Sequence, residues 1–221
     1  MAVARTVALA QHEPLGGMGV GVDLQSAIVM ALALALGAIV KGATGMGLPL
    51  VALPVLATVF GLQHAIGLMT IPLIATNAWQ VWRFRQEAQS PRLGFLPPFL
   101  VGGAIGVALG TWALVLTLGI ILLAYVALRL ATPHFALGLD AARRFGPLAG
   151  AGGGILQGAT GISAPIGVTF IHAMAMERPA HLFAVSAMVL TFSVVQLPAL
   201  WAAGVMRPEW LLQGLLALVP I

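Results

Sequence analysis

The segment "GAIVKGATGMGLPL" at residues 37–50 recurs, partly changed, as "GGILQGATGISAPI" at residues 153–166. The two copies are 116 positions apart (153 − 37), and at that offset both contain GATG, followed four residues later by a proline. The same offset pairs Gln80 with Gln196 in the apolar stretch after each copy. Shared residues at one fixed offset predict an internal duplication, so we expect two related halves.

Charged residues are rare and unevenly spread along the chain. Of 221 residues, 60% are hydrophobic and 7% are charged, whereas a soluble domain has about 25% charged residues. No Asp, Glu, Lys or Arg occurs in residues 42–82, 93–128, 145–176 or 179–206. Each stretch exceeds the roughly 20 residues that cross a bilayer as a helix. Because unpaired backbone groups are so unfavourable in lipid, we expect an all-α, polytopic membrane protein.

The apolar stretches predict about seven to eight transmembrane spans, arranged as two homologous repeats with interrupted helices. We expect a mobile tail over 1–23, a first transmembrane repeat over 24–129, a cytoplasmic loop over 130–146 and a second transmembrane repeat over 147–221, incomplete at its C-terminus. Hydropathy does not decide whether blocks 24–60 and 147–176 are single broken spans or tight hairpins.

Arginines indicate the orientation of the chain. Residues 83–92 contain three arginines, and residues 129–144 contain another three. Two crossings separate these loops, so both can lie on one side, which the positive-inside rule assigns to the cytoplasm. We therefore expect a multi-pass protein of the cell inner (plasma) membrane.

The composition also limits the partners of the chain. Its formal charge of +4 arises from so few ionisable groups that no nucleic-acid binding is indicated. The chain has no cysteine, which excludes disulfides and thiolate metal sites. We expect the lipid bilayer and a small anion as partners, with no cofactor and no metal. Homo-oligomerisation stays open.

The duplicated motif predicts a break in a membrane helix. Closely spaced glycines followed by a proline are poor continuations of a helix. A new half-helix is expected near Pro49 in the first copy and Pro165 in the second, because proline is favoured in a first helical turn. Free N–H groups at a half-helix start attract anions. Paired interrupted helices in two halves of a membrane protein indicate a transport site near the midplane.

Lys41, the single lysine of the chain, precedes the first GATG. A lysine at the bilayer centre is unfavourable by roughly 2.5–3.5 kcal/mol, so we expect it to face the interior and to favour anions such as a sulfonate. Its counterpart Gln157 would contribute hydrogen bonds without charge. The expected substrate-binding residues are Lys41, Gly42, Thr44, Gly45, Gln157, Gly158, Thr160, Gly161, Ser163, Asn77, Gln80 and Gln196.

Structural alternatives exist for each of these features. The GATG segments could be close helix crossings, as small-xxx-small motifs commonly are. Lys41 could extend from a helix end to the lipid headgroups. Gln80 and Gln196 could simply hydrogen-bond neighbouring helices. For the glycines of "GGAIGVALG" (102–110), which lack polar neighbours, we expect a packing role alone.

Two GATG loops, each followed by a proline, in a small polytopic chain resemble the sulfite exporter TauE/SafE family of bacterial membrane permeases. The resemblance covers roughly 30–83 and 147–204, and "GAGGGILQGATGISAPIG" (150–167) carries it most clearly. The first loop departs from this pattern, since it lacks the glycine run of 150–154. The resemblance implies a plasma-membrane transporter with duplicated helical halves that moves sulfite, organosulfonates or related small anions. The two Gly-rich loops are the only binding segments that it indicates.

We therefore expect a secondary transporter or exporter of a small sulfur-containing anion, and not an enzyme. The two GATG loops would face each other across a pseudo-twofold axis, and one half would rock against the other to give alternating access. A passive anion channel and a non-transporting assembly subunit are alternatives. An intramembrane serine protease, with Ser163 as nucleophile and His172 or His181 as base, is less favoured, because the other repeat has Gly47 in place of the serine.

Overall fold

A computed structural model describes residues 24–44, 47–112 and 138–221, and every regular element in these ranges is a helix. This confirms the expected all-α class. The elements are α2 (Leu24–Thr44), α3 (Gly47–Phe60), α4 (Leu62–Arg83), η1 (Arg85–Gln89), η2 (Pro91–Leu93), α5 (Leu96–Trp112), α7 (Leu139–Thr160), the π-helix η3 (Ala164–Val168), α8 (Thr169–His172), α9 (Arg178–Ala202) and α10 (Pro208–Leu216).

Three segments of the described chain are long and apolar enough to cross a membrane. They are Leu24–Gly42, Pro91–Thr111 and Arg178–Ala202. Away from their ends, each exposes large apolar side chains such as Leu32, Ile105 and Val194, as expected for contact with lipid. Trp79 and Trp82 are also exposed, and the guanidinium carbon of Arg85 lies 5.0 Å from the Trp82 ring centroid. Such aromatic and arginine pairs are typical of a membrane–water interface. The expected number of spans stays a prediction, since residues 113–137 lie outside the described ranges.

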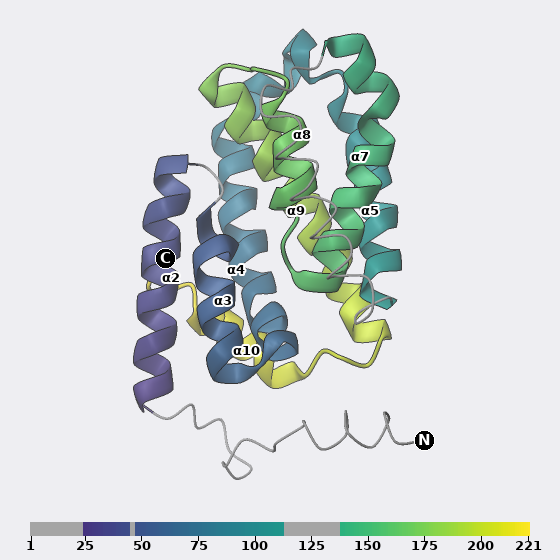
Figure 1. Cartoon of the computed structure of the whole chain (residues 1–221). Coiled ribbons are helices and arrows are strands. Elements are labelled where there is room, and N and C mark those ends of the chain that lie inside the picture. Colours follow the sequence, from purple (N-terminus) through teal and green to yellow (C-terminus); the bar gives the residue numbers. More distant parts are fainter. Residues whose placement is uncertain (1–23, 45–46, 113–137) are drawn as a thin grey trace.

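The helices form one bundle in which neighbours along the chain pack side by side (Figure 1). Helix α2 packs on α3, α3 on α4, and α4 on α9, while α5 packs on α7 and α9. Helix α10 lies across the lower end of Figure 1 against α4. Because α2 contacts α3 and α7 contacts η3, blocks 24–60 and 147–176 both form hairpins.

The helix bounds in the two halves correspond at the offset seen in the sequence. Adding 116 to the bounds of α2 gives 140–160, and α7 spans Leu139–Thr160. Adding 116 to the bounds of α4 gives 178–199, and α9 starts at Arg178. The directions are opposite: α2 and α4 run from the lower to the upper end of Figure 1, whereas α7 and α9 run downwards.

Helices α5 and α7 approach each other unusually closely through glycine. A Cβ atom on Gly106 would lie 2.1 Å from the carbonyl oxygen of Ala151, and one on Gly154 would lie 2.1 Å from that of Gly103. The other glycines of this crossing are Gly102, Gly110, Gly150 and Gly158. No side chain fits between these backbones, so the packing role predicted for the glycines of 102–110 is confirmed.

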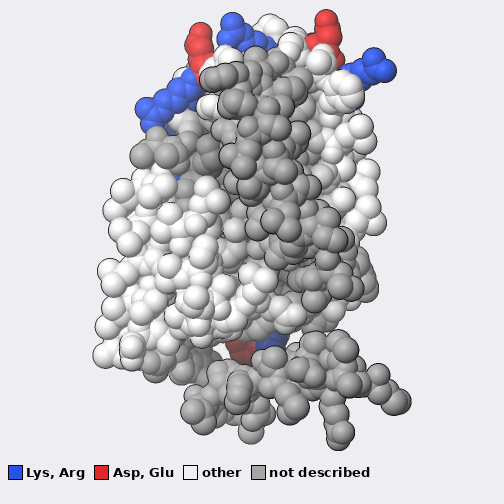
Figure 2. Space-filling view, in the orientation of Figure 1, with Lys and Arg blue, Asp and Glu red and all other residues white. Residues whose placement is uncertain are grey.

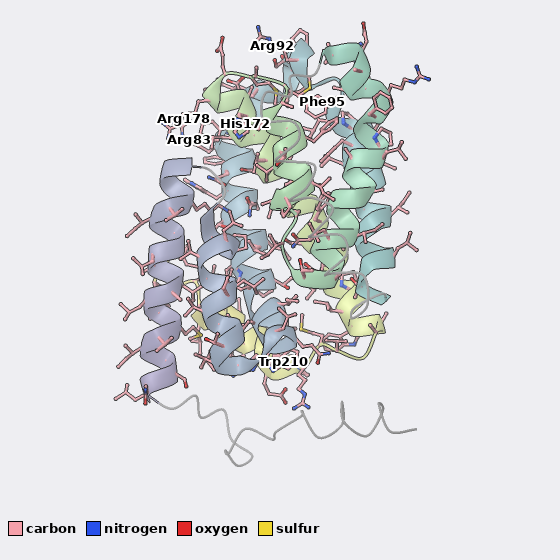
Figure 3. The ribbon with its side chains drawn as sticks, viewed as in Figure 1. Arg83, Arg92, Phe95, His172, Arg178 and Trp210 are labelled. Atoms are coloured by element: carbon pink, nitrogen blue, oxygen red, sulfur yellow. The ribbon has the colours of Figure 1, made fainter. Side chains whose placement is uncertain are left out.

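Charged side chains gather at the ends of the bundle. Figure 2 shows most of the charged side chains in view at the upper end, while the described residues in the middle of this face are almost all uncharged. Arg83, Arg92 and Arg178 lie at this upper end in Figure 3, where α7 also begins, whereas Trp210 lies at the opposite end. The arginines of 83–92 and the start of α7 thus share one end, as the sequence predicted.

Candidate functional site

The second GATG segment ends a helix, as its glycines and proline predicted. Helix α7 stops at Thr160, and Gly161 adopts the left-handed conformation with φ of 75°. The Gly161 N–H donates to the carbonyl of Gln157 at 2.7 Å, which closes the helix end. The helix resumes at Ala164, with Pro165 in the first turn of η3. Pro165 has no N–H to donate, and the helix in whose first turn it lies is a π-helix, which is wider than an α-helix.

The first GATG segment also separates two helices. Helix α2 ends at Thr44 and α3 begins at Gly47, with Pro49 in its first turn. The predicted site residue Gly45 and the side chain of Thr44 lie outside the described part of the structure. Gly42 is exposed, and a Cβ atom there would meet nothing within 4 Å. Its lack of a side chain is therefore not explained by helix packing.

Lys41 points into the bundle and not towards the headgroups. Its side chain is only 6% exposed, and Nζ donates to the Thr76 hydroxyl of α4 at 2.8 Å. The Thr76 hydroxyl in turn donates to the carbonyl of Pro72 at 2.7 Å. A lysine that extended to the surface would be exposed, so the snorkelling alternative is wrong.

The described carboxylates lie away from the middle of the long helices. Those in the described ranges are Glu87, Asp140, Glu177 and Glu209. Each belongs to a connection between helices or to the start of one. No salt bridge joins Lys41 to any of these described carboxylates, so its known partner is a neutral hydroxyl. In its charged form Lys41 would therefore have no counter-charge among the described residues.

Gln157 and Gln196 form a buried pair. Gln157 Nε2 donates to Gln196 Oε1 at 3.1 Å, and Gln196 Nε2 donates to the Gln157 carbonyl at 2.9 Å. Gln157 stands 116 positions after Lys41 (157 − 41). Both residues therefore connect the helix before a GATG segment to the second long helix after it: α2 to α4, and α7 to α9.

The remaining predicted site residues are distributed over several contacts. The Gln80 side-chain oxygen accepts a hydrogen bond from the Ser186 hydroxyl at 3.0 Å, joining α4 to α9. Asn77 donates to the Leu73 carbonyl of its own helix at 2.7 Å. Thr160 likewise donates to its own helix, and Ser163 is buried. No hydrogen bond among the described residues joins Lys41 or Thr76 to Gln157 or Gln196.

Gly158 has a structural explanation. A Cβ atom at this position would lie 2.4 Å from the Val107 carbonyl oxygen, so Gly158 belongs to the crossing of α5 and α7. This is the packing alternative raised for GATG, and it holds for this glycine of the second copy. Gly42, the equivalent residue of the first copy, has open space instead.

The family model of the sulfite exporter TauE/SafE matches residues 29–221, which is most of the chain. The chain belongs to the TauE/SafE family. It is therefore a membrane transport protein, and the resemblance seen in the sequence is confirmed. No curated protein and no solved structure matches the chain.

Two polar positions of this TauE/SafE protein were missed in the sequence. Thr76 lies one turn before Gln80 on α4, so it belongs to the same helix face as a residue that was recognised. Ser186 lies 116 positions after Thr70 (186 − 70), and both are buried hydroxyl residues. The offset that revealed Gln80 and Gln196 would have revealed this pair as well.

Proposed function

We propose that the chain exports a small sulfur-containing anion, such as sulfite or an organosulfonate, by alternating access, and that Lys41 recruits the anion. One observation carries the proposal: the buried ammonium group of Lys41 has a hydroxyl partner and no carboxylate partner among the described residues. An anion beside Lys41 would provide the missing counter-charge. Membership of the TauE/SafE family supports the choice of anion.

The electrostatics favour an anion over a neutral solute. A buried charge without a partner is destabilising by several kcal/mol, and a bound anion would reverse part of that penalty. A sulfur oxyanion has several acceptor oxygens, so it can accept from Lys41 and from nearby N–H and O–H donors together. Export from a negative-inside cell would gain about 2.3 kcal/mol per charge per 100 mV of membrane potential.

The second GATG segment would contribute neutral donors. Gly161 and Ser163 lie at the break before η3, and Thr160 and Gln157 form the last turn of α7. The N–H groups at the start of a half-helix are suited to an oxyanion. Gln196 would hold the Gln157 amide in place. We do not include Gly158, because it contacts the α5 backbone.

We propose further that residues 24–129 and 147–221 are two repeats of opposite orientation, with about seven to eight spans in the complete arrangement. The matching helix bounds at an offset of 116 and the opposite directions of α2 and α7 support this. Inverted repeats with interrupted helices are common in secondary transporters. The arginine-rich end would face the cytoplasm of a cell whose inner membrane holds the protein.

A flux measurement on Lys41→Met tests the proposal. In proteoliposomes loaded with sulfite or ethanesulfonate, we expect the wild-type chain to transport the anion with saturation and counterflow, and Lys41→Met to lose this flux. Lys41→Arg is the matched control, since it keeps the positive charge and should retain part of the flux. Elution as one symmetrical peak in detergent would show that both variants fold.

Three outcomes would contradict parts of this proposal. Unchanged flux in Lys41→Met would remove the lysine from the pathway. Flux that never saturates and shows no counterflow would indicate a passive channel. Saturable flux of other anions in place of sulfonates would leave transport intact and overturn the proposed substrate.

A further inference from the structure

The hydrogen bonds of Gln80 and Gln196 differ, although the two residues are equivalent at the offset of 116. Gln80, on α4, accepts from Ser186 of α9, in the other half of the chain. Gln196, on α9, pairs with Gln157 of α7, in its own half. The two equivalent glutamines thus have different kinds of partner: Gln80 bonds to a residue of the other half, whereas Gln196 bonds to a residue of its own half.

Shifting each bond by 116 positions gives its equivalent in the other half. The Gln80–Ser186 bond becomes a bond between Gln196 and Thr70. The Gln196–Gln157 bond becomes a bond between Gln80 and Lys41. All of these residues can form such bonds, since a hydroxyl both donates and accepts, and a lysine donates to an amide oxygen.

Neither equivalent bond is formed in this structure. Thr70 donates instead to the Ile66 carbonyl of its own helix at 2.9 Å. Lys41 donates to Thr76. Thr76 and Gln80 are four residues apart on α4, which is about 6 Å along a helix axis and on the same face. A move of Lys41 from one to the other is therefore a displacement by one helical turn.

We propose that Gln80 and Gln196 are positioning residues that exchange partners when the protein changes the side to which it opens. In the exchanged state Gln196 bonds to Thr70, and Gln80 releases Ser186 and bonds to Lys41. Two halves of related sequence and opposite orientation can each adopt the conformation of the other, which turns an inward-facing site into an outward-facing one. One-turn shifts of packed elements are a known form of such transitions.

The exchange also predicts how a substrate acts. This step rests on the proposed anion transport. The position equivalent to Thr76 is 192, and it is occupied by Phe192, which has no hydrogen-bonding side chain. In the exchanged state Gln157 would therefore lose its partner Gln196 and gain none in its place. A bound oxyanion could accept from this freed amide, so the substrate should favour the exchanged state.

Cross-linking tests the exchange directly, because the chain has no cysteine of its own. The pair Gln80→Cys with Ser186→Cys and the pair Thr70→Cys with Gln196→Cys each join positions that the antiparallel helices α4 and α9 bring opposite each other, so the change in each yield on adding the anion reports the exchange. Each pair is treated with a short bismaleimide in membranes, with and without ethanesulfonate, which does not react with thiols. The matched control joins Thr70→Cys to Val194→Cys, since Val194 is on α9 but is 50% exposed.

We expect both test pairs to cross-link and the control pair not to. Ethanesulfonate should raise the yield of the pair at 70 and 196 and lower that of the pair at 80 and 186. Yields that ethanesulfonate leaves unchanged in both test pairs would overturn the exchange. Failure of both pairs would overturn it too, since the register of α4 and α9 would then be different.

A conservative variant gives a second measurement that does not depend on cysteines. Thr70→Val keeps the shape of the side chain and leaves the observed Gln80–Ser186 bond intact. If the exchanged state needs the hydroxyl, the maximal flux should fall about tenfold with unchanged KM, while loss of the bond to the Ile66 carbonyl should lower the Tm only slightly. An unchanged maximal flux, or a loss explained by a lower Tm, would contradict the proposal.

The two proposals fail in different ways. Normal sulfonate flux in the wild-type chain, together with cross-linking yields that the sulfonate leaves unchanged, would overturn the exchange alone. Cross-linking yields that respond to the sulfonate in both test pairs, without any sulfonate flux, would overturn the proposed sulfonate transport and leave the exchange supported.

Discussion

Buried polar side chains are the most informative residues of this chain, because each needs a partner inside the bundle. Lys41 and Gln157 have partners on α4 and α9. Ser193 does not: its hydroxyl is fully buried and has no hydrogen-bond partner among the described residues. It is also the residue equivalent to Asn77 at the offset of 116.

Ser193→Ala should raise the free energy of unfolding by about 1 kcal/mol, because an unpaired buried hydroxyl is unfavourable and alanine removes it. Thermal unfolding in detergent, without added anion, would show the change as a higher Tm. Ser186→Ala is the comparison, since its hydroxyl is bonded to Gln80 and its loss should lower the Tm. A lower Tm for Ser193→Ala would mean that its hydroxyl has a partner.

The sequence predicted which polar residues lie inside the bundle better than it predicted their hydrogen-bond partners. That Lys41 faces inwards could be predicted from the unfavourable energy of a lysine in lipid. Its partner Thr76, 35 positions away, could not, because no local pattern joins the end of one helix to the middle of another. Gln80 and Gln196 were recognised from the repeat, but the repeat predicts equal surroundings and gives no sign of their different partners.

At the scale of elements, glycine spacing and backbone conformation determine where helices can touch and where they must end. Gly106→Val should prevent α5 and α7 from packing, since even the first side-chain atom would lie 2.1 Å from the Ala151 carbonyl oxygen. We expect loss of the monodisperse protein in size-exclusion chromatography. Gly42→Ala is the matched control and should remain folded, because nothing lies within 4 Å of a Cβ atom there. A folded Gly106→Val protein would contradict the close crossing.

Gly161→Ala should destabilise the protein by about 1–2 kcal/mol, because alanine at positive φ is strained. The residue has φ of 75°, and a Cβ atom would also lie 3.0 Å from Ile66 on α4. A denaturant or thermal unfolding curve would measure the loss. Gly138→Ala provides the control, since Gly138 has φ of −71° and open space around it. Equal stability of the two variants would argue against the helix end at Gly161.

The break after Thr160 could be predicted from its glycines and proline, whereas the form of the next helix could not. Residues 164–168 form a π-helix, which is rare and has no sequence signature. The hairpin formed by α2 and α3 was also undecided in the sequence. A run of apolar residues gives the length of a helix, but it does not say whether the next helix turns back beside it.

At the scale of the whole molecule, the distribution of arginines predicts which end faces the cytoplasm. Single cysteines at Gln89 and Glu209 would test this, since both positions are exposed and lie in or next to the connections at opposite ends of the bundle. In intact cells, a membrane-impermeant maleimide should label Glu209→Cys and spare Gln89→Cys. Permeabilised cells, in which both should react, are the control. The reverse labelling pattern would invert the proposed orientation.

The global arrangement was predicted in part. Charge-free stretches identified an all-helical membrane protein because burial of paired backbone groups in lipid allows few other folds. The position of α10 across one end, with Trp210 stacked on His64 at 4.7 Å, was not foreseen. Such contacts depend on the tertiary structure, and the nine residues of this helix are too few to span a bilayer.

The close crossing of α5 and α7 restricts how the molecule can open. It packs a helix that precedes residue 113 tightly against one that follows residue 138, so we expect this crossing to resist separation of the two halves. Helix α2 packs mainly on α3, and a single residue, Gly61 with φ of 82°, links α3 to α4. If the protein opens by a hinge motion, we therefore expect the hairpin that carries Lys41 to move about Gly61, while the glycine-packed pair α5 and α7 keeps its place.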